Sequence, residues 1–157
     1  MSVKFQPAEY HTATPTFIVD DAKAALAFYA KAFGARETAR FEHDGKIMHA
    51  EIQIGDSRIM LGEPIAEMGF VSARTLGGSP ASIMLYLEDV DAVFKRAIAA
   101  GAVEKNPLRD EFYGDRSASV IDPFGLRWIL STHKEDVSPE EMNKRFEKMM
   151  AGAGAEA

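Results

Sequence analysis

Hydrophobic and polar residues follow one pattern that occurs twice along the chain. In the first copy, the apolar segment 17–19 leads into an acidic pair, Asp20 and Asp21. Apolar residues then recur every three to four positions as far as Gly34. This spacing predicts an amphipathic helix. The acidic pair offers carboxylates to the helix N-terminus, and Gly34 lies where a left-handed C-cap would fall.

The second copy repeats these signals in the same order. Leu85 corresponds to Phe17, 68 residues earlier, and the acidic pair Glu88 and Asp89 again precedes a helical spacing that ends at Gly101. Near the end of each copy the offset becomes 69 residues, which one loop insertion would explain. We therefore predict two similar β-α-β-β-β modules in one domain, and an α+β fold.

The alternation of apolar residues and the turn signals place the elements. Module one covers about residues 10–63 and module two about residues 80–133. A glycine-rich connection joins them, and Ser138 with Pro139 opens a C-terminal helix over about 138–150. The expected strands are 12–19, 36–43, 46–54 and 57–62, then 82–88, 103–109, 115–121 and 126–132, with helices at 21–33 and 89–100.

Composition and charge exclude several classes of protein. The net charge is −6, whereas a nucleic-acid binder needs a basic surface. The chain has no cysteine, so disulfides, thiolate metal sites and cysteine nucleophiles are excluded. No apolar run is long enough for a membrane span, and residues 1–6 show no signal-peptide pattern. We expect a cytoplasmic protein with no nucleic-acid or membrane partner.

The module pattern and three short segments resemble the vicinal-oxygen-chelate superfamily, which includes glyoxalase I, bleomycin-resistance proteins and extradiol dioxygenases. The segments are 25–29 (Ala-Leu-Ala-Phe-Tyr), 113–116 (Tyr-Gly-Asp-Arg) and 122–128 (Asp-Pro-Phe-Gly-Leu-Arg-Trp). They are most similar to the PhnB-like branch. The resemblance implies a curved mixed sheet with helices outside, a small-molecule pocket inside each cup, and a homodimer that completes the cups.

The resemblance also implies where a divalent metal would bind. Catalytic members hold it with side chains on the first and last strand of each module. The corresponding residues here are Thr14, Met60, Ser82 and Ile129. Thioether and aliphatic side chains are not ligands for such a metal, and the two hydroxyls are weak ones. We therefore expect no metal at these positions and no cofactor.

His49 and Glu51 are the candidates for a displaced site. They alternate onto one face of a predicted strand. One interpretation is a displaced metal-ligand pair, or a general base beside a carboxylate. The other is a polar pair on a half-solvated face. His11, His43 and His133 are expected at the surface.

Strand alternation assigns the residues that line the cup. Arg58 and Arg127 occupy matching positions and could grip a carboxylate or phosphonate. The alternative for both is a surface ion pair at the rim. Tyr113 and Arg116 are expected near the same cup, where Tyr113 either stacks on a ligand or serves a plain hairpin. The predicted binding residues are Thr14, Arg58, Met60, Ser82, Met84, Tyr86, Tyr113, Arg116, Arg127 and Ile129.

Three functions remain open at this point. The favoured one is a metal-free small-molecule-binding protein. The second is a PhnB-like lyase, isomerase or dioxygenase with a displaced metal site near His49 and Glu51. The third is a purely structural dimer module. The fold alone does not decide among them.

Overall fold

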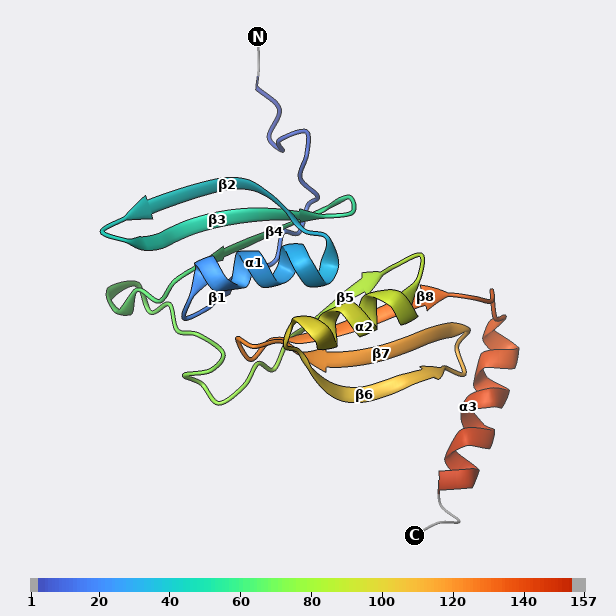
Figure 1. Ribbon diagram of the computed structural model, residues 1–157. Coiled ribbons are helices and arrows are strands. Elements are labelled where there is room, and N and C mark those ends of the chain that lie inside the picture. Colours follow the sequence, from blue (N-terminus) through green and yellow to red (C-terminus); the bar gives the residue numbers. More distant parts are fainter. Residues whose placement is uncertain (1–2, 154–157) are drawn as a thin grey trace.

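The computed structural model describes residues 3–153. It contains two β-α-β-β-β modules followed by a C-terminal helix (Figure 1). The α+β class and the modular repeat are confirmed. Module one consists of β1 (Thr16–Ile18), α1 (Ala22–Phe33), β2 (Arg36–His43), β3 (Lys46–Ile54) and β4 (Ser57–Gly62). Module two consists of β5 (Ser82–Tyr86), α2 (Val90–Ala100), β6 (Val103–Asp110), β7 (Asp115–Ile121) and β8 (Arg127–His133).

The strands pair only within their own module. Sheet one has the order β1-β4-β3-β2, and sheet two has the order β5-β8-β7-β6. In both, the first strand runs parallel to the last and the other pairs are antiparallel. Within one chain the expected curved sheet is therefore divided into two four-stranded sheets.

The helix ends show why the acidic pairs and glycines recur. Asp21 and Asp89 are the N-caps, and their carboxylates accept hydrogen bonds from the backbone N–H of Ala24 (2.8 Å) and Ala92 (3.0 Å). Gly34 and Gly101 end the helices in the left-handed conformation. Of each acidic pair, the second residue is the cap.

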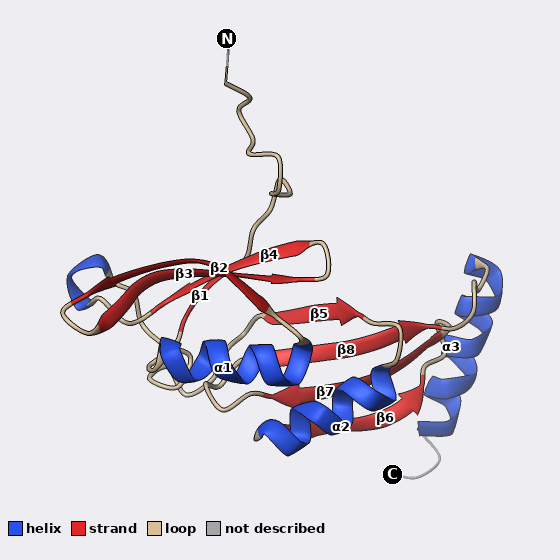
Figure 2. Cartoon of the chain, turned by 45° about the horizontal axis from the view of Figure 1, so that its top comes forward, coloured by secondary structure: helices blue, strands red, loops and turns tan. Residues whose placement is uncertain are grey.

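The two helices pack against each other and close one shared core. The strand residues that alternate with the predicted cup-lining residues face this core. Five of them are almost fully buried: Val19, Ile59, Leu61, Trp128 and Leu130. Phe17 of β1 contacts Trp128 of β8 edge to face, with ring centroids 6.2 Å apart. Because both sheets turn their apolar faces to this core, their other faces point away from it (Figure 2).

Two further elements lie outside the modules. A short 3₁₀ helix (Ala66–Met68) interrupts the connection between them. The C-terminal helix α3 (Pro139–Ala153) begins after Ser138, whose hydroxyl accepts from the N–H of Glu141 at 3.2 Å. Phe146 of α3 packs on Phe112 with ring centroids 5.5 Å apart. No helix among the residues that the structure describes could cross a lipid bilayer.

Candidate functional site

Each sheet has a face turned away from the shared core, and we call it the cup face. The strand register defines it in sheet two, where Met84 pairs with Ile129 and Ile129 pairs with Ser119. In sheet one, the equivalent pairs are Thr16 with Met60 and Met60 with Glu51. Paired residues project to the same side of a sheet. The predicted cup-lining residues on β4, β5 and β8 therefore share the cup faces.

The later part of the N-terminal segment (residues 3–15) contacts the cup face of sheet one, where Glu9 meets Arg58 and Tyr10 meets Glu51, whereas its first residues extend away from the sheet (Figure 1). A hollow of about 480 Å³ lies within this segment, and Met60 of β4 closes it on the side of the sheet. Its lining residues include Phe5, Tyr10, Thr14 and Met60. The volume falls within the range of about 300–1,000 Å³ typical of small-molecule pockets. Two of the four positions transferred from the metal-binding relatives therefore line this hollow.

Glu51 connects the polar residues below the N-terminal segment. Its carboxylate accepts hydrogen bonds from the Tyr10 hydroxyl, from His49 Nε2 (3.1 Å) and from Arg58 Nη1 (3.4 Å). The hydrogen bond from Tyr10, followed by that from His49, lowers the pKa of Glu51 below its usual value, against the effect of burial. The structure thus brings His49 and Glu51 together, as their alternation predicts. The pair can hold and transfer a proton at His49 Nε2.

Arg58 is enclosed in the same cluster. Its guanidinium lies over the Tyr10 ring, 5.1 Å from the centroid, and donates to Thr38 Oγ1 at 2.6 Å. It also forms an ion pair with Glu9. The nearly buried Arg58 therefore joins two carboxylates, Glu51 on the sheet and the solvent-exposed Glu9.

The cup face of sheet two carries a smaller hollow. It measures about 190 Å³, and its lining includes Asn106, Tyr113, Ser119, Arg127 and Ile129. This hollow shares no lining residue with the one on sheet one. Thr14 and Met60 therefore lie at one hollow and Ile129 at the other. Ser82 lies on the exposed edge strand β5.

A buried carboxylate beside this hollow has no counterpart among the predicted site residues. Asp115, which is 3% exposed, accepts from the Ser131 hydroxyl at 3.0 Å and contacts His133 Nδ1 at 2.7 Å. Hydrogen bonding to Asp115, and then to Asp136, raises the pKa of His133. His133 is half exposed, as expected, but it is bound to a buried acid. The segment 113–116 contained this signal, because Asp115 shares the parity of the cup-facing serines.

Arg116 does not lie at the cup. It forms a two-point ion pair with Asp91 of α2, through Nε (2.7 Å) and Nη2 (2.9 Å), and a further contact with Asp110. Its neighbour Ser117 faces the cup, so strand alternation turns Arg116 towards the helix. Tyr113, by contrast, lies at the hollow of sheet two.

The donor set does not fit a divalent cation. The four transferred positions supply two hydroxyls, one thioether and one aliphatic side chain, and no anionic oxygen or imidazole. Within residues 3–153 no group of three or more His, Asp or Glu side chains is arranged to hold a metal ion.

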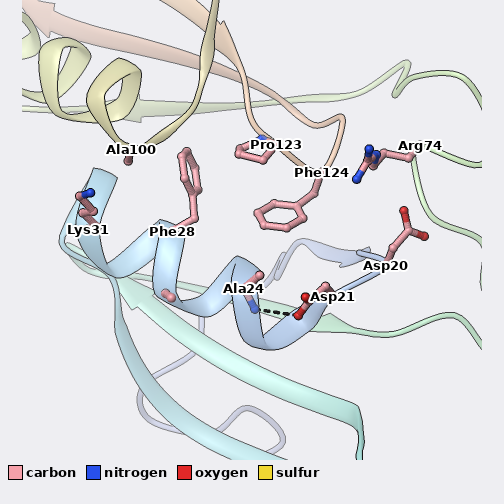
Figure 3. Close-up of a pocket in the computed structure, with 10 residues that line it drawn as sticks. Asp20, Asp21, Ala24, Phe28, Lys31, Arg74, Ala100, Pro123 and Phe124 are labelled. Atoms are coloured by element: carbon pink, nitrogen blue, oxygen red, sulfur yellow. Dashed lines mark hydrogen bonds between the residues drawn. The ribbon is translucent and has the colours of Figure 1, made fainter.

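A third hollow, of about 550 Å³, lies on the helical side where the modules join (Figure 3). Phe28 of α1 and Phe124 of the β7–β8 turn form its apolar wall, with Asp20 and Arg74 at the other end. It contains none of the predicted site residues. Its aromatic rings continue the shared core, and the ring centroids of Phe28 and Phe124 lie 6.1 Å apart. This hollow therefore lies along the contact between the two modules.

In each β-α-β-β-β module the first strand pairs in parallel with the last, and the cup face of the sheet is left open. Two such modules in one chain define a class of paired-module proteins. Residues 11–130 match the Glyoxalase/Bleomycin resistance protein/Dioxygenase superfamily, and the chain belongs to this superfamily. The expected family is confirmed, and the PhnB-like branch receives only loose support.

Relatives and solved structures agree with this assignment. The chain is 38% identical over 146 residues to "uncharacterized protein Mb0911c" of Mycobacterium bovis, which covers 90% of this chain and 93% of the relative. It is similar to the crystal structure of TioX from Micromonospora sp. ML1 (TM-score 0.60, 27% identity, 77% of this chain and 98% of that one). A PhnB protein from Bacillus cereus shares the fold (TM-score 0.60, 14% identity, 78% of this chain and 99% of that one).

Proposed function

We propose that the chain is a metal-free small-molecule-binding protein whose cups are completed by a second copy of itself. The observation that carries the proposal is the exposure of apolar side chains on the cup face of sheet two. Met84 is 40% exposed and Tyr86 is 66% exposed on its edge strand. Adjacent exposed apolar side chains on a concave face favour a ligand or a partner.

The geometry supports a second copy as the missing wall. The two cup faces of one chain both point away from the shared core, so they do not enclose one hollow together. The strands β1 and β5 are sheet edges in the single chain. A two-fold dimer can set sheet one of one copy against sheet two of the other, and this arrangement gives two closed cups.

Ligand binding is tested by thermal shift against a broad metabolite library. A ligand that binds the native state raises the melting temperature. The variant Ile129→Trp fills the hollow of sheet two and should abolish that rise. The control Ala99→Trp, on the exposed side of α2, should keep it. A library without any stabilising compound, or equal shifts in Ile129→Trp and wild type, would contradict binding in the cup.

Two further measurements address the dimer and the metal. Light scattering should give a dimer at micromolar concentration, and a monomer would refute the completed cup. Elemental analysis of the purified protein should give no stoichiometric metal. One metal ion per chain would contradict the metal-free site.

The contact between His49 and Glu51 favours one second candidate, an enzyme that transfers a proton at His49. The substrate would lie on the cup face of sheet one, beside His49. In that case His49→Ala should abolish turnover in an activity screen, while the exposed-histidine control His43→Ala should not. Unchanged turnover in His49→Ala would exclude this candidate.

A further inference from the structure

We propose that the hollow on sheet two binds the anionic group of a small organic acid, a carboxylate or a phosphonate, and that Arg127 contacts it. This inference rests on the proposed function, because it names the ligand class of one cup. It comes from a comparison of the two repeats, which place an arginine at the same position and give it different neighbours.

The repeat aligns Glu51 with Ser119. Glu51 pairs with Met60 in sheet one, and Ser119 pairs with Ile129 in sheet two. Both residues thus lie on the cup face, on the strand beside the arginine. The carboxylate that contacts Arg58 in module one is replaced by a neutral hydroxyl in module two.

The two guanidinium groups have different charge environments as a result. Arg58 forms ion pairs with Glu51 and with Glu9 of the N-terminal segment. Arg127 Nη2 donates to Ser119 Oγ at 3.4 Å. With the Asn106 carboxamide in the orientation that satisfies its neighbours, which exchanges its oxygen and nitrogen, the oxygen accepts from Nη2 at 3.1 Å. In the part of the chain that the structure describes, no carboxylate forms an ion pair with Arg127.

Arg127 also has a buried N–H group that donates no hydrogen bond, the one at Nε. Arg58 Nε is buried in the same way, but there two carboxylates compensate the charge. A partly buried cation with only neutral acceptors is unfavourable until an anion joins it. Guanidinium groups hold carboxylates and phosphonates through paired hydrogen bonds.

Two acids lie at this hollow, Glu111 in its lining and Asp115 next to it, and both already have partners. Glu111 is bound to Arg109 at 2.8 Å. Asp115 is bound to His133 and to Ser131. Neither acid contacts Arg127, so neither neutralises its charge.

The size of the hollow limits what enters it. At about 190 Å³ it is smaller than a pocket for a whole ligand. It therefore suits the acidic group alone, while the apolar remainder of the ligand lies over Ile129 and Met84. These two side chains are paired neighbours on the same face.

The test uses three probes of similar shape: benzoate, phenylphosphonate and the neutral benzamide. Calorimetry on the full chain measures affinity, and the NMR signals of the Arg127 guanidinium N–H groups report a change in the surroundings of this side chain. We expect benzoate or phenylphosphonate to bind at least about tenfold more tightly than benzamide, because a hydrogen bond to a charged group is typically worth that factor or more. Which acid binds more tightly distinguishes a carboxylate ligand from a phosphonate ligand.

Two variants and one control locate the interaction. Arg127→Gln removes the cation, and Ser119→Glu introduces the acid of module one, so both should weaken binding of the acid at least about tenfold. Module one shows that a glutamate fits beside an arginine in this position. Ala99→Glu adds the same charge on the exposed side of α2 and should change the affinity less than about twofold. If Ser119→Glu does not fold, Arg127→Gln decides.

Three results would overturn the inference: equal binding of benzamide and the acids, wild-type affinity in Arg127→Gln, or no saturable binding of either acid up to about 10 mM. A stabilising neutral metabolite that binds Arg127→Gln as well as wild type would refute the anion site while leaving the cup function intact. The absence of any ligand in the thermal-shift library would refute the cup function itself.

Discussion

Replacing Asp122 with alanine should destabilise the whole chain, because four donors converge on this carboxylate. Tyr29 Oη (2.9 Å) and Trp128 Nε1 (2.8 Å) donate to one oxygen, and the backbone N–H groups of Phe124 and Leu126 donate to the other, both at 2.9 Å. Tyr29 comes from module one and the other donors from module two. The carboxylate therefore joins the two modules inside the shared core.

The expected loss follows from the burial of these groups. Tyr29 and Trp128 are fully buried, so in Asp122→Ala their polar hydrogens lose their acceptor without access to water. An unsatisfied buried donor costs about 1–3 kcal/mol, and breaking a buried charged network costs about 3–5 kcal/mol. We expect a loss of about 4 kcal/mol, which for this chain length lowers the melting temperature by roughly 8–16 °C.

Urea unfolding followed by the fluorescence of Trp128, the single tryptophan, measures this loss. The comparison is made at one protein concentration, because association shifts apparent stability. Asp89→Ala is the matched control. It also removes an aspartate that accepts from the backbone, but at an exposed helix cap, and should cost about 1 kcal/mol. If Asp122→Ala costs no more than Asp89→Ala, the network does not stabilise the joint.

Two further predictions concern the backbone and the pH dependence. In Gly114→Ala the new Cβ would lie 2.2 Å from the carbonyl oxygen of Glu135, at a φ of +97°. We therefore expect the free energy of unfolding in urea to fall by more than about 2 kcal/mol. The control Gly45→Ala, where nothing lies within 4 Å of the new Cβ, should lose about 1 kcal/mol. A similar loss in both would contradict the steric argument. Since the Tyr10 hydroxyl lowers the pKa of Glu51 below 4.5, the stabilisation by its ionised form is complete above pH 4.5 and is lost as the pH falls through the lowered pKa. The difference in melting temperature between wild type and Glu51→Gln should shrink over that range, and a constant difference would refute the linkage.

The repeat, the helix caps and the division of each strand into two faces could be predicted from the sequence. They depend on local spacing, which a single chain displays directly. The start of β1 was predicted too early, at residue 12 rather than Thr16. Pro15 precedes the strand, and its carbonyl accepts from Met60 N–H, while proline itself has no N–H to donate to the sheet.

The contacts of the arginines could not be predicted in the same way. The ion pair between Arg58 and Glu9 depends on the path of the N-terminal segment across sheet one, which no periodic pattern encodes. The placement of both helices on a common core depends on contacts between residues far apart in the sequence. The difference between Glu51 and Ser119 was present in the repeat, but its meaning required knowing that each lies beside an arginine.

The shared core has a consequence for how this duplicated chain can change. Helix α1 of module one packs its aromatic side chains, Phe28, Tyr29 and Phe33, against Phe124 and Trp128 of module two in the same chain. A fragment that ended in the connection would leave the aromatic residues of α1 without these partners. Substitutions on the outward faces of the two halves therefore leave this core unchanged, whereas substitutions on the inward face of one half must fit the side chains of the other.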